Sequence, residues 1–459
     1  MLQKFKKIVD RLINDHLGEM LLIRKSDCNF LKCKNKQVMI TLLLLLFNCA
    51  YVFAQSPPPP PPLPTPTGRS CFSYAIGPYT RGSTVTPSGE PILEKSVFVP
   101  RDTIIVVYAQ AIRNEINRAD LKLRVDGADT HITIATTKVV EWQTATLLWS
   151  NTYSKGSYNF AIYDANGKDW GVDGYAKLTL MMFPISIPGI ALYTANSPNV
   201  CPGTGAIPRD IASTTVTLTE TSVLAIFAQS VTPSLYGIFQ LFVDSTVIAE
   251  SYWSWSNPGE STSLWQGVSI VQYKQYNAGT YTVKVGIKNS ANGNFGCNGE
   301  WGRVLNVVVL PVGTSGLNVQ TKAEDFPGPI ALPPGNNIIS YDVNVPVEST
   351  LLSAGSVLGG TGNDNRNDYL LDCNNPDCRS PISIYNIRSG SYRSGQLFSV
   401  CDAVGTATFG LRQNSGYSAV PHKESTYIST LVVPATYCDV AAADVLPCNQ
   451  LRVGDYPWK

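Results

Sequence analysis

The segment Glu141–Phe160 reads EWQTATLLWSNTYSKGSYNF, and the segment Ser263–Val283 reads SLWQGVSIVQYKQYNAGTYTV. In each segment a Trp-Gln pair precedes an apolar, strand-like stretch and a glycine turn, and the tryptophan stands 14 positions before the glycine. The two tryptophans, Trp142 and Trp265, are 123 residues apart. A period of this length predicts tandem copies of a whole domain rather than a solenoid of short repeats.

A third, more divergent copy follows the first two. Its opening segment VNVPVESTLLSAGSV (343–357) corresponds to SVFVPRDTIIVVYAQ (96–110) and TVTLTETSVLAIFAQ (215–229). Its segment DYLLDC (368–373) stands where the first copy has the Asp turn of LKLRVDG. The turn glycines and the closing prolines recur at nearly constant spacing in the three copies: Gly156, Gly279 and Gly405, and Pro184, Pro311 and Pro434.

The apolar pattern of each copy predicts an all-β fold. Short runs of alternating or continuous β-branched residues are bounded by turn residues, and helical periodicity is almost absent. We expect three tandem β-sandwiches of about 125 residues, jelly-roll or immunoglobulin-like. Jelly-roll is favoured because the Cys–Trp–Cys spacing of immunoglobulin domains is missing. Trp142 and Trp265 are then core residues, with Tyr392 near the equivalent place. The predicted boundaries are 69–185, 186–312 and 313–435, followed by a tail over 436–459.

The N-terminal extension, residues 1–54, predicts a secretory signal peptide. Lys32, Lys34 and Lys36 precede an uncharged apolar run from Val38 to Phe53. Val52 and Ala54 place small or medium residues before a cut at Gln55. A charged region, an apolar region and a small-residue cleavage site in this order are typical of exported proteins. A retained membrane anchor is the alternative, although the run is short for a bilayer span of about 20 residues.

Residues 55–68 read QSPPPPPPLPTPTG and predict a stalk. Successive prolines favour polyproline II, which rises about 3.1 Å per residue and acts as a semi-rigid spacer. The Ser-Pro-Pro-Pro-Pro run resembles extensin-like, hydroxyproline-rich wall glycoproteins over residues 56–66 only. The resemblance implies hydroxylated and O-glycosylated prolines and a wall or matrix location. A plain linker is the alternative interpretation.

Composition limits the partners. The 459 residues carry a net charge of +1 and only 15% charged residues, so no strong field attracts nucleic acid or an anionic membrane. We therefore expect neither a nucleic-acid partner nor membrane association after signal cleavage. The abundance of Tyr, Ser, Thr, Val and Gly is typical of β proteins.

The cysteines support export. Three of the 11 cysteines precede the predicted cut, so eight remain in the exported chain. An even number of cysteines in an exported chain implies disulfides. The expected pairings are Cys201–Cys297 and Cys373–Cys378. Zinc is disfavoured because CNNPDC (373–378) lacks a second cysteine pair or a nearby histidine. The disulfide candidates are Cys71, Cys201, Cys297, Cys373, Cys378, Cys401, Cys438 and Cys448.

Catalytic signatures are sparse. The mature chain has two histidines, His131 and His422, and neither stands near a nucleophile and an acid in the sequence. Paired carboxylates hydrolyse glycosidic bonds without histidine, and Asp169, Asp173 and Glu300 are the candidates for that alternative. The interpretation that we prefer is a protein that is not an enzyme.

Two segments have the composition of calcium loops. The first, GGTGNDNRNDYLLD (359–372), and the second, YDANGKDWGVD (163–173), are rich in the side-chain oxygens that calcium prefers. Neither has the order of an EF-hand, and ordinary turns have a similar composition. The candidate ligands are Asn363, Asp364, Asn365, Asn367, Asp368 and Asp372 in the first, and Asp164, Asn166, Asp169 and Asp173 in the second.

One aromatic pair has no counterpart in the first copy. SYWSWSNPGES (251–261) places Trp253 and Trp255 two positions apart, so that in a strand they share one face. Such a pair is either a platform for sugar rings or a contact with another domain or partner.

Together these observations predict a secreted, extracellular or cell-surface protein with a structural or adhesive role. It would act in a matrix, coat or filament by surface binding and self-association, with sheet edges as the natural assembly points. Its partners would be other copies or matrix proteins, and glycans if the Trp253–Trp255 pair is a platform. A lectin-like protein is the alternative, and a glycoside hydrolase is the second alternative.

Overall fold

A computed structural model describes the chain from Phe72 to Asp439 with gaps. The described residues are 72–76, 90–113, 117–137, 143–164, 176–195, 209–232, 236–254, 266–288, 304–313, 316–324, 336–359, 366–375, 378, 380, 383–386, 393–415 and 424–439. The chain divides into two compact units, Met1–Thr67 and Gly68–Lys459, and every described residue belongs to the second. The signal peptide and the stalk lie outside the described residues.

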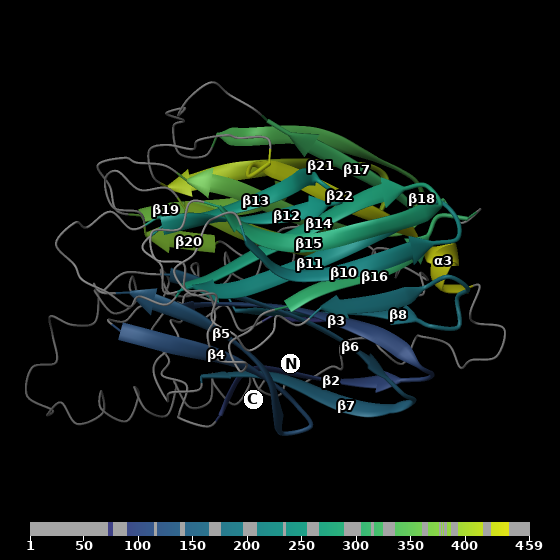
Figure 1. The fold of residues 1–459 in the computed structure, drawn as a ribbon, viewed down its shortest axis with the longest axis horizontal. Helices are drawn as coiled ribbons and strands as arrows, with labels where there is room; N and C mark the ends of the chain where they lie inside the picture. The colour runs from purple at the N-terminus through teal and green to yellow at the C-terminus, as the bar shows by residue number, and fades with distance from the viewer. Residues whose placement is uncertain are drawn as a thin grey trace, which may run out of the picture. The chain divides into compact units, whose positions relative to one another are not determined.

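The first repeat consists of eight strands in two antiparallel sheets (Figure 1). One sheet has the order β1-β8-β3-β6 and the other β2-β7-β4-β5. The strands are β1 (Phe72–Ile76), β2 (Pro91–Val99), β3 (Thr103–Arg113), β4 (Asn117–Val125), β5 (Ala128–Thr137), β6 (Gln143–Tyr153), β7 (Gly156–Asp164) and β8 (Lys177–Pro184).

The second repeat has the same connectivity. One sheet has the order β14-β11-β16-β9, and the other strands follow the order β10-β15-β12-β13. The strands are β9 (Ala191–Ala195), β10 (Arg209–Leu218), β11 (Ser222–Thr232), β12 (Tyr236–Val243), β13 (Thr246–Ser254), β14 (Gln266–Tyr276), β15 (Gly279–Lys288) and β16 (Val304–Pro311).

In the third repeat, the second and third strands join into one long strand, and the sixth and seventh strands join into another. Strands β18 (Asn337–Gly359) and β21 (Arg393–Ser415) have 23 residues each, and the register of β18 shifts between Val345 and Ser349. Residues 349–359 of β18 lie between β21 and β22 (Tyr427–Pro434), which pairs with β17 (Asn318–Ala323). Residues 405–412 of β21 pair with residues 337–345 of β18 on one side. On the other side, residues 409–415 of β21 pair with β19 (Arg366–Cys373), and β19 pairs with β20 (Ser383–Asn386).

Numbered one to eight within each repeat, the strands have the orders 1-8-3-6 and 2-7-4-5 three times. The predicted closing strands are confirmed, because β8, β16 and β22 end at Pro184, Pro311 and Pro434. The all-β prediction is also confirmed. The short helix α3 (Ala435–Asp439) follows the last strand. Among the described residues, no helix has the length and apolar character needed to span a membrane.

Each repeat has its own inner hydrophobic cluster. Val107 and Leu180 of one sheet pack with Leu123 and Ile162 of the other in the first repeat. Ile226 and Val307 pack with Phe239 and Val285 in the second. Leu351 and Leu397 pack with Leu371 and Phe409 in the third. Burying one face of each sheet in this way is the main source of stability for strands.

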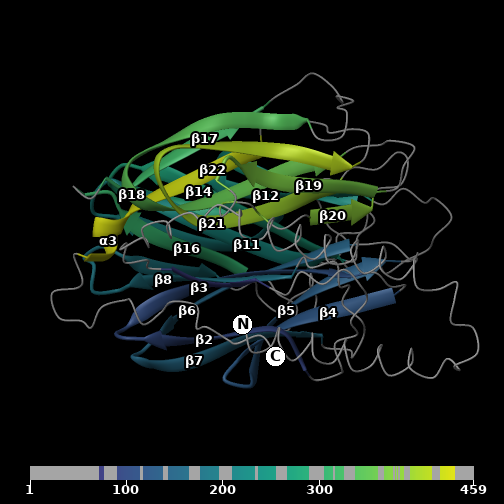
Figure 2. The same cartoon turned by 180° about the vertical axis from the view of Figure 1, so that it is seen from behind.

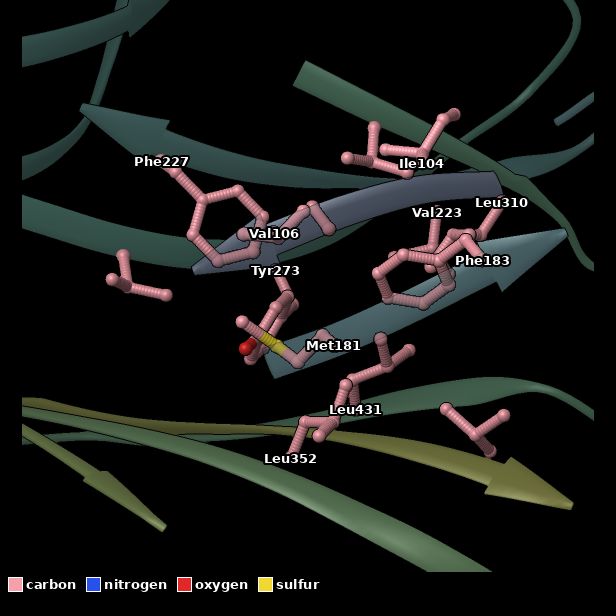
Figure 3. Packing of buried hydrophobic residues seen from close by; sticks show 14 of the residues in the cluster. Ile104, Val106, Met181, Phe183, Val223, Phe227, Tyr273, Leu310, Leu352 and Leu431 are labelled. Carbon is pink, nitrogen blue, oxygen red and sulfur yellow. The ribbon is translucent and has the colours of Figure 1, made fainter. Parts of the chain in front are cut away.

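A fourth cluster joins the three repeats (Figure 3). Its strand residues lie on the face of the 1-8-3-6 sheet that points away from the inner cluster of each repeat. Equivalent positions by register meet there: Val106, Ala225 and Leu352; Met181, Val308 and Leu431; and Phe183, Leu310 and Val433. Because these sheets bury both faces, their strands read as continuous apolar runs in the sequence rather than as alternating ones.

The segments between repeats also enter this shared core. Ile187 and Ile190 follow the first repeat, Leu317 follows the second, and Tyr437 follows the third. A Cβ added to Gly189 would lie 2.6 Å from Cγ of Pro311, so the first linker packs directly on the end of the second repeat. A Cβ added to Gly316 of the second linker would likewise lie 3.5 Å from Cγ of Pro434, so Pro311 and Pro434 each stand where a linker meets the next closing strand.

The repeats contact one another in a closed cycle. Strand five of each repeat contacts strand six of the next: β5 contacts β14, β13 contacts β21, and β20 contacts β6 of the first repeat. Figure 2 shows β5, β6, β14, β20 and β21 from behind. The last repeat therefore returns to the first, and the three repeats do not follow one another as separate units on a string.

Candidate functional site

The strand order separates two ends of the sheets. At the first, which we call the turn end, strands two and three and strands six and seven are joined by short connections, such as residues 100–102 and 154–155. At the other, which we call the loop end, most gaps between consecutive strands are longer, such as 165–176, 255–265 and 289–303, and the short exceptions are 114–116 and 233–235. Long connections on a rigid β scaffold are where binding residues concentrate. The loop end is therefore the candidate binding end.

Hydrogen bonds between repeats cap the open edge of strand six. Leu148, Val271 and Phe398 are equivalent, because each pairs with the same position of strand three. The backbone of each forms a hydrogen bond with a side chain of another repeat: Lys177 Nζ donates to Phe398 O at 3.1 Å, Tyr427 OH donates to Val271 O at 2.9 Å, and Leu148 N donates to Gln229 Oε1 at 2.5 Å. Each bond gives a partner to a backbone group of strand six at the edge of its sheet, where a neighbouring strand is missing.

Lys177 brings a buried amine into this interface. It lies fully buried between the first and third repeats, where the cost of removing an ammonium from water lowers its pKa to about 7. Its neighbours by register and hydrogen bond, Gln110 and Phe398, carry no charge. The residue at the equivalent position of the third repeat, Tyr427, makes the corresponding bond with a neutral hydroxyl.

A polar cluster joins the second and third repeats near the loop end. We call Gln240, Glu250, Tyr252, Ser394 and Glu424 the junction cluster. The buried carboxylate of Glu250 accepts from Gln240 Nε2 at 2.5 Å and from Tyr252 OH at 2.7 Å. The backbone N–H of Glu250 donates to Glu424 O at 2.7 Å, and that of Tyr252 donates to Ser394 Oγ at 2.9 Å.

The electrostatics of the junction cluster keep Tyr252 protonated. Burial is the first cause that raises the pKa of the Tyr252 phenol above its usual value, and the hydrogen bond and charge of Glu250 add to it. The phenol is therefore a permanent donor to Glu250 at neutral pH. The Glu250 carboxylate therefore links β12 to β13, and the bond from Tyr252 N to Ser394 Oγ joins β13 to β21.

Trp253 follows this cluster directly. Its backbone pairs with Gly237 of β12 and with Arg393 of β21, so it lies at the strand end where the second and third repeats meet. The side chain of Trp253 and the whole of Trp255 lie outside the described residues. The sequence left open a sugar platform or a contact between domains, and both interpretations stay predictions.

The predicted calcium ligands are mostly outside the described residues. Asp164 is the last residue of β7 and is buried, whereas Asp372 of β19 forms an ion pair with Arg412 at 3.2 Å. Asn367 and Asp368 belong to β19 by their backbone. Within the part of the chain that the structure describes, no three His, Cys, Asp or Glu side chains gather into a metal site. The remaining candidates, Asn363, Asp364, Asn365, Asn166, Asp169 and Asp173, lie outside it.

The predicted pairing of Cys373 with Cys378 is wrong. The disulfide joins Cys378 to Cys401 of β21, with their Cα atoms 4.9 Å apart. Cys373 ends β19 in the inner cluster, and its thiol donates to Asn374 Oδ1 at 3.4 Å. The connection after β19 folds back over β21, because Ser399 Oγ donates to the Cys378 carbonyl. The side chains of Cys71, Cys201, Cys297, Cys438 and Cys448 lie outside the described residues.

Other sequence candidates are placed only in part. His131 lies on β5 by its backbone, whereas His422, Glu300, Trp142, Trp265 and Tyr392 lie outside the described residues. Sequence reasoning missed Lys177, the junction cluster and the side-chain caps of strand six. The one available signal was the appearance of Lys177, Gln110 and Gln229 beside continuous apolar runs, where a polar side chain needs a partner.

Comparisons with known proteins assign no family. No protein-family model matches the sequence, and no curated protein matches it. Solved structures with detectable similarity include PNGF-II, with 11% identity, a TM-score of 0.26 and coverage of 52% of this chain and 65% of PNGF-II. The chain thus spans under two thirds of PNGF-II.

Two further solved structures are similar at the same low level. The insecticidal delta-endotoxin Cry8Ea1 of Bacillus thuringiensis has 8% identity, a TM-score of 0.18 and coverage of 51% of this chain and 54% of the toxin. The Sulfolobus turreted icosahedral virus structure has 10% identity, a TM-score of 0.17 and coverage of 79% and 89%. With every TM-score this low, these similarities indicate no function.

Proposed function

We propose that the chain is a secreted structural or adhesive protein that acts by surface binding and self-association. In this proposal a signal peptide and a polyproline stalk precede three tandem jelly-roll sandwiches, over 69–185, 186–312 and 313–435, with a tail over 436–459. The strand orders 1-8-3-6 and 2-7-4-5 in each repeat support the jelly-roll assignment.

The observation that carries the proposed function is the cyclic packing of the three repeats. Because β20 returns to β6, the loop ends of the repeats are held together on one β scaffold, and the shared core keeps their relative positions. A rigid scaffold that presents several long connections at one end suits binding to an extended surface. Low net charge and strands with open edges suit assembly with other copies.

The test is the association state of Gln55–Lys459 produced by a secretory, oxidising route. Light scattering and electron microscopy over a range of concentrations should show ordered multimers that grow with concentration. A monomer at every concentration would remove self-association from the proposed function. The same sample would then be tested for binding to surface glycans and matrix proteins.

A lectin-like function is the second candidate, and the position of Trp253 favours it. The strand that carries Trp253 ends at the loop end, where the junction cluster holds the backbone in place. Aromatic rings beside polar groups are suited to stack against sugars. A lectin would show sugar-dependent tryptophan fluorescence that Trp253→Ala abolishes. Phe98→Ala is the matched control, because Phe98 is an exposed aromatic residue near the turn end of β2.

A further inference from the structure

Strand two of each repeat lies at the edge of its sheet. Within the described residues β2 pairs only with β7, β10 only with β15, and the first part of β18 only with β21. The other side of each strand offers backbone N–H and C=O groups in a row. Such an edge binds another strand unless charge, proline, a bulge or a cover prevents it.

Two of these three edges are protected. Strand β2 begins with Pro91 and has Glu94 and Lys95 at its centre. In the third repeat the amide of Gln320 covers the edge of β18, because its Nε2 donates to Asn344 O at 2.9 Å and its Oε1 accepts from Asn344 N at 3.1 Å. A side-chain amide that makes both bonds occupies the place that a neighbouring strand would take.

Within the described residues, the stretch of β10 from Ala212 to Leu218 lacks these devices, and the register shift of β10 lies before it, between Asp210 and Ala212. The sequence between Asp210 and Glu220 is IASTTVTLT, which contains neither a charge nor a proline and is rich in β-branched residues. Tyr193, which is equivalent to Gln320 by register, makes a single bond from its hydroxyl to Thr217 O at 3.5 Å. The side chains of Ser213, Thr215 and Thr217 are exposed, whereas Val216 and Leu218 are buried in the second repeat.

We propose that β10 is the self-association edge of this protein and that its partner is β10 of a second copy, paired antiparallel across a two-fold axis. This proposal rests on the self-association part of the proposed function and names its surface. Pairing of two identical edges satisfies both rows of backbone groups at once. It would also extend the sheet that runs from β10 through β15, β12 and β13 into β21 of the third repeat.

The charges at the two ends of β10 favour a second copy as the partner. Arg209 begins the strand and Glu220 follows its end. When Thr215 faces Thr215 of the second copy at the two-fold axis, the antiparallel register, counted through the bulge at Ile211, places Arg209 opposite Glu220 of that copy, twice by symmetry. Opposite charges in facing positions stabilise a strand pair, and the uncharged centre introduces no repulsion.

The first test places a charge in the middle of the edge. Thr215→Lys should weaken association about tenfold or more, because two lysines would face each other near the two-fold axis. Thr215 is exposed, so the monomer should keep its fold, which circular dichroism checks. Ser340→Lys is the matched control, because Ser340 is exposed on the covered edge of β18 and should leave association unchanged.

A charge exchange tests the identity of the partner. Glu220→Arg alone should weaken association, because Arg209 would face an arginine. Arg209→Glu combined with Glu220→Arg should restore it. Sedimentation velocity of Gln55–Lys459 over a concentration series measures each variant. If the double variant is as weak as Glu220→Arg, this antiparallel register is wrong.

The outcomes separate this proposal from the broader one. A wild-type monomer at all concentrations overturns both. A wild type that associates together with an unchanged Thr215→Lys overturns the β10 edge and leaves self-association to another surface. Loss of association in Thr215→Lys but not in Ser340→Lys, with rescue by the charge exchange, supports β10 pairing with a second copy.

Discussion

Tyr108 stacks on Phe398 with the ring centroids 4.7 Å apart, although 290 residues separate them in the sequence. The Tyr108 hydroxyl donates to Gln110 Oε1 at 3.0 Å, and both rings are fully buried. The contact joins the first repeat to the third inside the shared core. The folding of these two repeats is therefore coupled through side chains that no single repeat could bury alone.

Phe398→Ala should destabilise the whole of residues 68–459. Removing a buried aromatic side chain costs about 3–5 kcal/mol in the free energy of unfolding. We expect one cooperative transition in urea, shifted to lower urea concentration. Phe398→Leu should cost much less, since it preserves more volume. Separate transitions for the repeats, with only one of them shifted, would contradict a shared core.

Asp244→Ala should destabilise the second repeat by about 1–2 kcal/mol. The Asp244 carboxylate accepts from Thr282 N at 2.8 Å, and its backbone has a φ of 53°, which alanine adopts poorly. Asp244→Asn is the matched control and should be nearly neutral, because Asn374 makes the same bond to Thr408 N at 3.0 Å in the third repeat. Urea unfolding measures both variants, and equal losses would disprove the role of the hydrogen bond.

Lys177 should make stability rise with pH between about 7 and 10.5. Its folded-state pKa is about 7, against 10.5 when it is exposed, so the unfolded chain binds more protons in that window. The slope approaches about 1.4 kcal/mol per pH unit for one such group. Lys177→Met should remove this slope and raise stability at neutral pH, because no ammonium must then be buried.

Comparing wild type with Lys177→Met isolates the contribution of Lys177 to the pH dependence of stability. Tyrosines with raised pKa titrate in both, so only the difference in unfolding free energy between wild type and Lys177→Met is informative. A difference that stays constant from pH 7 to 10 would show that Lys177 is charged in the folded protein.

Cys378 and Cys401 should be recovered in one disulfide-linked peptide after proteolysis under non-reducing conditions. Closing the 23-residue loop should stabilise the fold by about 3 kcal/mol. The double variant Cys378→Ala, Cys401→Ala should lose about that amount in urea unfolding, whereas Cys373→Ser should keep the linked peptide. A Cys373–Cys378 peptide from the wild type would contradict this disulfide.

Much of the local structure could be predicted because it depends on local pattern. The closing strands end at the predicted prolines. The predicted turn at Gly405 is wrong, because Gly405 lies inside the continuous strand β21, although its φ is 88°. The sequence alignment places the Asp turn of the third copy slightly too early, at DYLLDC. Asn374 accepts a hydrogen bond from Thr408 N, as Asp126 accepts one from Asn159 N in the first copy. The candidate site was less predictable, since the junction cluster joins residues from two repeats.

The sequence by itself determined the strands, the turns and the three-fold repetition, because each depends on neighbours a few residues away and recurs at a fixed period. Only the tertiary structure decided that the repeats close into a cycle around a shared core. The same apolar runs could have been buried within each repeat or between repeats, and periodicity does not distinguish the two. The partner of Cys401, the environment of Lys177 and the unprotected edge of β10 follow from that packing, because each depends on which distant strand lies beside it.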